Sequence, residues 1–227
     1  MSKNKLRTQN GGDSPVPELE AHSKAYIVEE IELNSDTAKK IYRHHFVAFG
    51  DKINSISNIT RIVGDPGDAK DAEKIIDDLF ATYEEKLDKR LTMCEQVMSD
   101  ARIKGHSKFT TPVSLEAKCL TSHHIRYLDL IKKVDKLCIL LNTINIRGEI
   151  ATDEVHKYQR EWNNRLANLA NRVRTLSNDL KHKYIARQKL AKSNDAANAS
   201  SASDADESTV KTSEISKPLT TKEPAVA

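Results

Sequence analysis

The feature that most constrains this chain is a long apolar seam in its second half. Successive members of the seam are three or four residues apart, which is the spacing of one face of an α-helix that packs along a neighbour. Such a helix gains most of its stability by covering that face, so the chain has to place another helix beside it. The seam consists of Val155, Tyr158, Trp162, Leu166, Leu169, Val173, Leu176, Leu180 and Tyr184.

A second apolar stripe directly precedes the seam and supplies the neighbouring helix. Gly148 is a typical helix stop, and Thr152 is an N-cap followed by two acidic residues, which favour the first turn of a helix. We therefore expect a helical hairpin from Ser122 to Lys192 that bends at residues 145–149. The stripe on its first arm consists of Leu128, Ile131, Val134, Cys138, Leu141 and Ile144.

The segments before the hairpin are predicted to add two strands and two further helices. Residues 25–33 and 112–120 alternate apolar and polar side chains in the manner of half-buried strands, and we expect them to pair. Between them we expect a short helix whose apolar stripe ends at Phe46, a loop from Gly50 to Gly67, and a long helix that begins at Asp68. The predicted fold class is mainly α with a small β component.

The composition of the chain changes at both ends of this helical body. Residues 1–12 form a basic N-terminal arm, and residues 13–24 form a stiff, polar linker that contains two prolines. Residues 25–192 form the helical body with its short strands. Residues 193–227 hold almost no large apolar side chain, so we expect a disordered tail there.

The net charge of +3 hides an uneven distribution along the chain. The formal charges of residues 1–35 sum to −2 and those of residues 193–227 sum to −3, so residues 36–192 carry a net charge of +8. A basic body between more acidic ends suits an anionic partner such as nucleic acid, and double-stranded DNA is the partner that we expect.

The N-terminal arm has the chemistry of a segment that contacts DNA. Lys3, Lys5 and Arg7 recur at every second position, with no acid among the first ten residues, and their side chains can reach phosphates. The side-chain amides of Gln9 and Asn10 can bond base edges, as such amides do with adenine. The alternative is that these residues form a frayed chain end without a function.

The last helix is the second candidate for contact with DNA. Residues 153–192 hold ten basic residues against four acidic ones, and the final twelve, which include Lys181, Lys183 and Arg187, contain no acid. A charged helical face is usually just solvated, yet a run without acids favours an anionic partner. Arg147, on the exposed bend, is a further candidate, although a basic residue at this place can instead cap the carbonyls of the preceding helix.

Several functional classes are disfavoured by the motifs that the sequence lacks. The three cysteines, Cys94, Cys119 and Cys138, are widely spaced among apolar residues, so we expect reduced thiols in the core. The pairs His44-His45 and His123-His124 are adjacent in sequence, and adjacent residues of a helix point in different directions, so no metal site is predicted. No phosphate-binding glycine loop or catalytic motif is present, and we expect neither an enzyme, nor a cofactor, nor a small-molecule substrate.

The same reasoning applies to the location of the protein. The sequence contains no run of about eighteen apolar residues, the length that a membrane-spanning helix needs. Its first ten residues also lack the apolar stretch of a signal peptide. The expected location is the cytoplasm.

The pattern of strand, hairpin and basic helix from Pro112 to Arg174 resembles the AcaB-like regulators of conjugative plasmids and integrating conjugative elements. The matching features are the strand from Val113 to Leu120, the turn Gly148-Glu149-Ile150, and Arg172-Val173-Arg174 on the last helix. Tyr127, Leu128, Val134, Asp135 and Leu141 match on the intervening helix, and the stretch from Ile27 to Tyr42 is similar to the strand and first helix of the family.

This resemblance implies a dimeric, sequence-specific transcriptional regulator of conjugative transfer genes that holds DNA in a ribbon-helix-helix-like way. Such proteins place a two-stranded ribbon in the major groove, one strand from each protomer. The strand at residues 25–33 exposes Glu30 and Glu32, which would face phosphates unfavourably, so we expect it to be structural. The arm from Lys3 to Asn10 is the better candidate for DNA contact.

Two further expectations concern partners. The seam from Val155 to Tyr184 is longer than the first arm of the hairpin can cover, so we expect a homodimer in which a second copy buries the excess. The competing class is a helical structural or adaptor protein that acts through protein–protein contacts and uses its basic face only for solubility.

Overall fold

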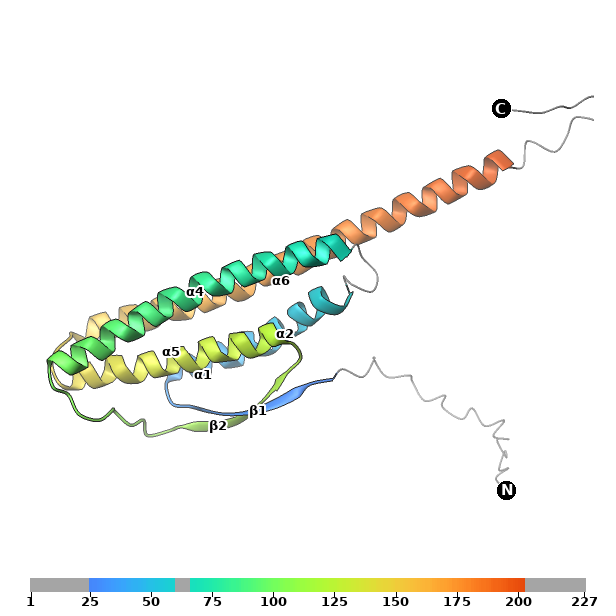
Figure 1. Ribbon diagram of the computed structural model, residues 1–227. Coiled ribbons are helices and arrows are strands. Elements are labelled where there is room, and N and C mark those ends of the chain that lie inside the picture. Colours follow the sequence, from blue (N-terminus) through green and yellow to red (C-terminus); the bar gives the residue numbers. More distant parts are fainter. Residues whose placement is uncertain (1–24, 60–65, 203–227) are drawn as a thin grey trace, which may run out of the picture. The chain divides into compact units, whose positions relative to one another are not determined.

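The computed structural model describes residues 25–59 and 66–202 of the chain. These residues divide into a first unit that ends at His182 and a second unit that begins at Lys183. The elements are β1 (Ile27–Leu33), α1 (Asp36–Ile41), η1 (Tyr42–Phe46), α2 (Val47–Asn54), η2 (Ser55–Ile59), α4 (Pro66–Asp100), β2 (Val113–Cys119), α5 (Ser122–Ile146) and α6 (Thr152–Ala202) (Figure 1). The predicted arm at residues 1–12 and the linker at 13–24 lie outside the described residues.

The two predicted strands form an antiparallel ribbon. Ile27 lies opposite Cys119 and Leu33 lies opposite Val113. The inward face of the ribbon buries Ile31 and Leu33, because alternate residues of a strand point to one side and these are the apolar ones. The predicted pairing of residues 25–33 with the later strand is therefore confirmed, as is a mainly helical fold with one small sheet.

The segment after β1 is helical for longer than the sequence indicated. Ser35 caps α1, where its hydroxyl accepts the N–H of Ala38 at 3.2 Å. The chain then continues through the π-helical turn η1 into α2 and η2, so the loop predicted from Gly50 to Gly67 is wrong for residues 50–59. The physical reason is burial, since helical backbone places Phe49, Ile53 and Ile56 in the core.

The three long helices α4, α5 and α6 pack on one another within the first unit (Figure 1). The hydroxyl of Tyr127 on α5 donates to the carbonyl of Leu166 on α6 at 3.2 Å. The guanidinium of Arg90 on α4 lies over the ring of Tyr158 on α6, at 4.2 Å from its centroid. Each pair of helices is therefore held by direct contacts, and α5 buries the largest share of its surface.

The bend between α5 and α6 has the predicted location and a defined backbone cause. Gly148 has a φ of +83°, the left-handed conformation that favours glycine. Its N–H donates to the carbonyl of Asn145 at 2.9 Å, and the N–H of Glu149 donates to Ile144 at 3.1 Å. This pair of bonds is the Schellman motif that ends a helix, so the predicted hairpin is confirmed.

The excess of the seam on α6 is covered within one chain. Six seam residues are buried in the single protomer, and α4 lies along the part of α6 that α5 leaves open (Figure 1). Burial of these residues in the first unit does not depend on a second copy, so the length of the seam does not by itself require the expected homodimer, which stays a prediction. The six residues are Val155, Trp162, Leu166, Leu169, Val173 and Leu180.

The last helix also extends past its predicted end. The tail was expected to begin at residue 193, but α6 continues to Ala202. Alanine has the highest helix propensity, and residues 191–202 contain five alanines, which accounts for the extension. The part of the predicted tail from 203 to 227 lies outside the described residues.

The three cysteines have the environment that the sequence indicated. Cys94, Cys119 and Cys138 are buried free thiols. Burial raises the pKa of the Cys138 thiol to about 11, so this group stays protonated and unreactive at neutral pH. None of the helices in the described residues is long and apolar enough to cross a membrane.

Candidate nucleic-acid interface

The positive charge of α5 is neutralised by ion pairs within the fold. All four of its lysine and arginine side chains lie near carboxylates. Lys133 contacts Asp88 of α4 at 2.7 Å, and Lys136 contacts Glu95 of the same helix at 2.7 Å. Arg126 bridges two further acids of α4. Arg126, Lys133 and Lys136 thus hold α4 against α5, Lys132 pairs with Glu29 and Asp129, and all four bases are poorly placed to bind an external anion.

Three basic residues of α6 differ from those of α5 in this respect. Arg160, Arg174 and Lys181 are exposed, and within residues 25–59 and 66–202 they form no ion pair. They are fourteen and seven residues apart, which places them along one stripe of the helix at intervals of about 21 and 10 Å. We define these three residues as the α6 basic stripe. It is a part of the described positive charge that an anionic partner can reach.

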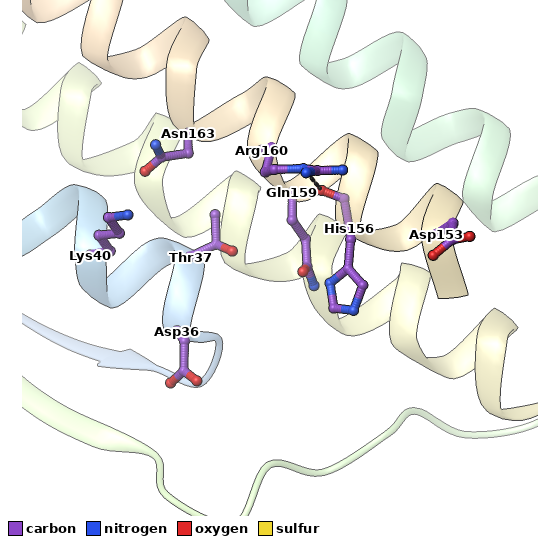
Figure 2. A pocket seen from close by; sticks show the side chains of 8 residues that line it. All are labelled: Asp36, Thr37, Lys40, Asp153, His156, Gln159, Arg160 and Asn163. Carbon is purple, nitrogen blue, oxygen red and sulfur yellow. Dashed lines mark hydrogen bonds between the residues drawn. The ribbon is translucent and has the colours of Figure 1, made fainter. Parts of the chain in front are cut away.

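At one end of the α6 basic stripe lies a groove between α1 and α6 (Figure 2). The groove has a volume of about 530 Å³, and its residues, from both helices, all belong to the first unit. We call it the α1–α6 groove. Its walls consist of Asp36, Thr37, Lys40, Asp153, His156, Gln159, Arg160 and Asn163.

The side chains of the α1–α6 groove offer mainly hydrogen-bond donors and positive charge on one side. Lys40 of α1 and Arg160 of α6 are exposed cations, and the amides of Gln159 and Asn163 line the same groove (Figure 2). The Nε of Arg160 donates to the carbonyl of His156 at 3.3 Å, which fixes the start of its side chain along the helix. Cations beside amides are the groups that bind phosphates and sugar–base edges of nucleic acids.

Two carboxylates limit the basic part of the groove. Asp36 and Asp153 lie in the first turns of α1 and α6, where a carboxylate stabilises the helix. Asp36 is also bound by Lys39 at 3.4 Å. An anion is therefore expected to bind at the end formed by Lys40, Arg160 and Asn163, and from there along the α6 basic stripe.

The outward face of the β-ribbon has the wrong charge for contact with DNA. Glu30 lies directly opposite Glu116, and Glu32 lies opposite Ser114. Only Lys118, opposite Val28, is basic on this face. The interpretation of residues 25–33 as a structural strand agrees with this arrangement, and β1 forms its pair with β2 of the same chain.

The sequence-predicted site residues lie in several different places. Lys3, Lys5, Arg7, Gln9 and Asn10 fall outside the described residues. Lys181 is the last member of the α6 basic stripe, in the first unit, whereas Lys183 and Arg187 belong to the second unit. The structure thus places Lys181 on the same face of α6 as Arg160 and Arg174, and apart from Arg147 on the bend.

Arg147 lies at the C-cap of α5 with an exposed side chain. The alternative role for it was capping of the last carbonyls of α5. The carbonyls of Ile144 and Asn145 instead accept the backbone N–H groups of Glu149 and Gly148. The backbone therefore performs the capping, which leaves the guanidinium exposed on the bend.

The histidines have separate structural environments. The Nε2 of His123 lies 3.1 Å from the Oδ1 of Asp77 on α4. His124 is buried, with Nε2 bonded to the carbonyl of Phe46 at 3.0 Å and Nδ1 accepting the N–H of Leu120 at 3.3 Å. No group of three histidine, cysteine or acidic side chains suited to a metal ion occurs in the part of the chain that the structure describes.

The sequence interpretation missed the groove residues of α1 and their polar neighbours on α6. Gln159 and Asn163 follow His156 at the spacing of one helical face, directly beside the apolar seam. That polar stripe was a usable signal. The proximity of Lys40 to this polar stripe could not be predicted, because α1 and α6 are more than a hundred residues apart in sequence.

The comparisons with known proteins give a fold. No protein-family model matches the sequence, and no curated protein matches it either. Among solved structures, this chain is similar to the crystal structure of selenomethionine-containing AcaB from uropathogenic E. coli. The TM-score is 0.71 at 20% sequence identity, over 75% of this chain and 88% of that chain. The chain has an AcaB-like fold.

Proposed function

We propose that this protein is a sequence-specific, DNA-binding transcriptional regulator that controls conjugative transfer genes of a mobile element. The observation that carries the proposal is the AcaB-like fold, which covers three quarters of the chain. It agrees with the resemblance of the strand, hairpin and basic helix to AcaB-like regulators.

The distribution of charge supports DNA as the partner. The bases of α5 are paired with acids, whereas the α6 basic stripe of Arg160, Arg174 and Lys181 is exposed. A protein that neutralises phosphates with such residues gains affinity through release of counterions. The stripe gives a backbone-positioning contact and carries no sequence information, so specificity has to come from other residues.

We assign the base-reading contact to the N-terminal arm. Lys3, Lys5 and Arg7 supply phosphate contacts, and Gln9 and Asn10 supply amides for base edges. In a homodimer, two such arms would form the ribbon of a ribbon-helix-helix-like arrangement. The acidic outward face of β1 and β2 supports the arm over the described ribbon for this role.

The proposal is tested by a mobility-shift titration of the full chain against promoter fragments of the element that encodes it. Scrambled duplex of equal length serves as competitor, and the titration is repeated at several salt concentrations. We expect the cognate fragment to bind at least about a thousandfold more tightly than the scrambled duplex, with an affinity that falls steeply as salt rises.

The competing adaptor function predicts a different result. An adaptor would show weak binding with equal affinity for both duplexes, and a defined protein partner would be recovered by pull-down. Equal affinity for cognate and scrambled DNA, at every salt concentration, would reject a sequence-specific regulator.

The homodimer is part of this proposal and is tested separately. Sedimentation of the full chain at micromolar concentration is expected to give the mass of two copies of the 25.5 kDa chain. A monomer under these conditions would remove the two-fold symmetry on which a two-armed DNA reader depends.

A further inference from the structure

A second pocket lies between the outward face of the β-ribbon and the segment from η1 to α2. It has a volume of about 290 Å³, and all its residues belong to the first unit. Its walls include the rings of Tyr26, Tyr42 and Phe46. Ligand pockets are typically concave, mostly apolar and provided with a few polar groups, and this pocket has that character.

The inner wall of the pocket is a stack of aromatic rings. Tyr42 and Phe46 stack with centroids 4.7 Å apart, and the imidazole of His124 lies 4.0 Å from Phe46. Tyr42 and Phe46 are the first and last residues of η1, one π-helical turn. Such turns are rare and occur frequently at functional sites, and here the turn places two rings on one side of the pocket.

The floor of the pocket offers little hydrogen bonding to a ligand. Both nitrogens of His124 are already bonded, one to the carbonyl of Phe46 and the other to the N–H of Leu120. The part of a ligand that enters the pocket should therefore be apolar, and flat if it is to stack on the rings.

The mouth of the pocket has exposed apolar and charged side chains. Val47 is 68% exposed and Tyr26 is 53% exposed, so both present apolar surface to a ligand at the mouth. Glu116 also lines the pocket, and the register places Glu30 directly opposite it. Like charges in directly opposed positions of a ribbon are destabilising, so a cation bound beside Glu116 would relieve a repulsion.

The single base at the mouth is already engaged. The Nζ of Lys118 lies over the ring of Tyr26, 5.1 Å from its centroid. Two acids line the pocket, Glu116 and Asp51, against this one lysine, so the charge of the described lining is complementary to a cation.

We propose that this pocket binds a small aromatic amine, with its ring against Tyr42 and Phe46 and its ammonium group beside Glu116. A volume of 290 Å³ corresponds to roughly ten water molecules, which limits the ligand to one or two fused rings with a short amine chain. The inference does not depend on the proposed binding of DNA. The pocket is built from three segments that are far apart in the sequence, so no local motif marks it as a small-molecule site.

The test uses three probes that share one ring system and differ in charge. Tryptamine is the cation, indole is the neutral ring, and indole-3-acetate is the anion; each is titrated into the full chain by calorimetry. We expect tryptamine to bind with a Kd in the range of about 0.1 to 1 mM, in line with a ligand of this size. Indole should bind more weakly, and indole-3-acetate most weakly of all.

Two variants connect the binding to the pocket. Val47→Trp places a ring in the mouth from an exposed position and should abolish measurable binding of tryptamine. Glu116→Gln should weaken tryptamine about two- to fivefold and leave indole unchanged, as expected for the loss of one exposed charge contact. Met93→Trp, at an exposed position of α4 that does not line the pocket, is the matched control.

Each change is at an exposed residue, so all three variants are expected to fold. Thermal melts check this expectation. The proposal is overturned by absence of saturable tryptamine binding, by equal or tighter binding of indole-3-acetate, or by unchanged tryptamine binding in Val47→Trp.

Discussion

The carboxylate of Asp135, in the middle of α5, accepts the backbone N–H of Ser35 at 2.7 Å, across a separation of one hundred residues. The same carboxylate accepts the N–H and the side-chain amide of Asn34, at 3.0 and 3.2 Å. Asp135 is buried, and so is Ser35. A single charged group therefore fixes the turn between β1 and α1 onto the central helix, and with it the position of Lys40 in the α1–α6 groove.

Replacement of Asp135 by alanine should destabilise the whole first unit. The change leaves two backbone donors at the turn without their acceptor in a buried place, which costs about 2 to 3 kcal/mol of unfolding free energy. Urea unfolding followed by circular dichroism measures the loss. Asp129→Ala, an exposed acid on the same helix, is the control and should change stability by less than about 0.5 kcal/mol. Equal effects of the two variants would show that the buried bonds contribute nothing.

Gly50 of α2 packs so closely on His124 that no side chain fits between them. A Cβ added at Gly50 would lie 2.1 Å from the imidazole. In an exposed helix the change from glycine to alanine stabilises, but here we expect Gly50→Ala to destabilise by about 1 to 3 kcal/mol, because the ring has to move. The double variant Gly50→Ala/His124→Ala should be more stable than the sum of the two single changes predicts. Strict additivity in chemical denaturation would contradict this contact.

The burial of His124 predicts a dependence of stability on pH. Burial lowers the pKa of His124, while its bond to the carbonyl of Phe46 and the charge of Asp51 act less strongly in the opposite direction. The unfolded chain, with a histidine pKa near 6.5, therefore takes up a proton at a higher pH than the folded chain does. Stability from this group is fully present above pH 6.5 and is lost as the pH falls towards the folded pKa.

The measurement compares unfolding free energies at pH 7.5 and 5.5 in the parent chain and in His124→Gln. The parent should lose more stability than the variant over this interval. The pKa of His45 is also lowered, by burial and by His44, so His45 contributes in the same direction in both proteins. An identical loss in both proteins would exclude His124 as a source of the pH dependence.

Gly50 also illustrates what the sequence could not reveal about the fold. Glycine and the polar residues that follow it are typical of a loop, which is why residues 50–67 were predicted to form one. The helix forms because Phe49, Ile53 and Ile56 reach the core, a tertiary effect that overrides local preference. By contrast, the paired strands and the bend at Gly148 were predictable, since each depends on a local pattern of alternation or a glycine in the left-handed region.

The candidate interface was likewise predictable from the sequence only in part. The spacing of Arg160, Arg174 and Lys181 along one face of α6 can be read from the sequence by helical periodicity. The sequence does not reveal which of the many basic residues are neutralised, because the acids that pair with Lys133 and Lys136 lie on another helix. The contribution of α1 to the groove likewise depends on packing between distant segments.

The N-terminal arm and the bend are tested by four single substitutions. If Asn10 reads a base, Asn10→Ala should cost about 1 to 3 kcal/mol on the cognate site and little on random DNA. Lys5→Ala and Arg7→Ala should weaken binding to both and reduce the salt slope by about one each. Arg147→Ala should leave thermal stability unchanged, because the backbone caps α5, and should reduce affinity only if the guanidinium contacts DNA.

The α6 basic stripe makes the most direct prediction from the described charges. If Arg174 and Lys181 each contact a phosphate, the double variant Arg174→Ala/Lys181→Ala should weaken binding to cognate and random DNA alike. Each lost contact should reduce the magnitude of the slope of log affinity against log salt concentration by about 0.9, so the pair should reduce it by about 1.8. Both residues are exposed, and thermal stability should change little.

The matched control for the stripe removes positive charge that the fold already neutralises. Lys133→Ala changes the net charge by one unit, but Lys133 is paired with Asp88 at 2.7 Å, so the salt slope should remain that of the parent chain. A slope that falls by the same amount per charge in the control and in the α6 variant would mean that DNA senses only net charge. A slope unchanged in the α6 variant would reject the stripe as a phosphate contact and leave the N-terminal arm and Arg147 as the candidates for DNA binding.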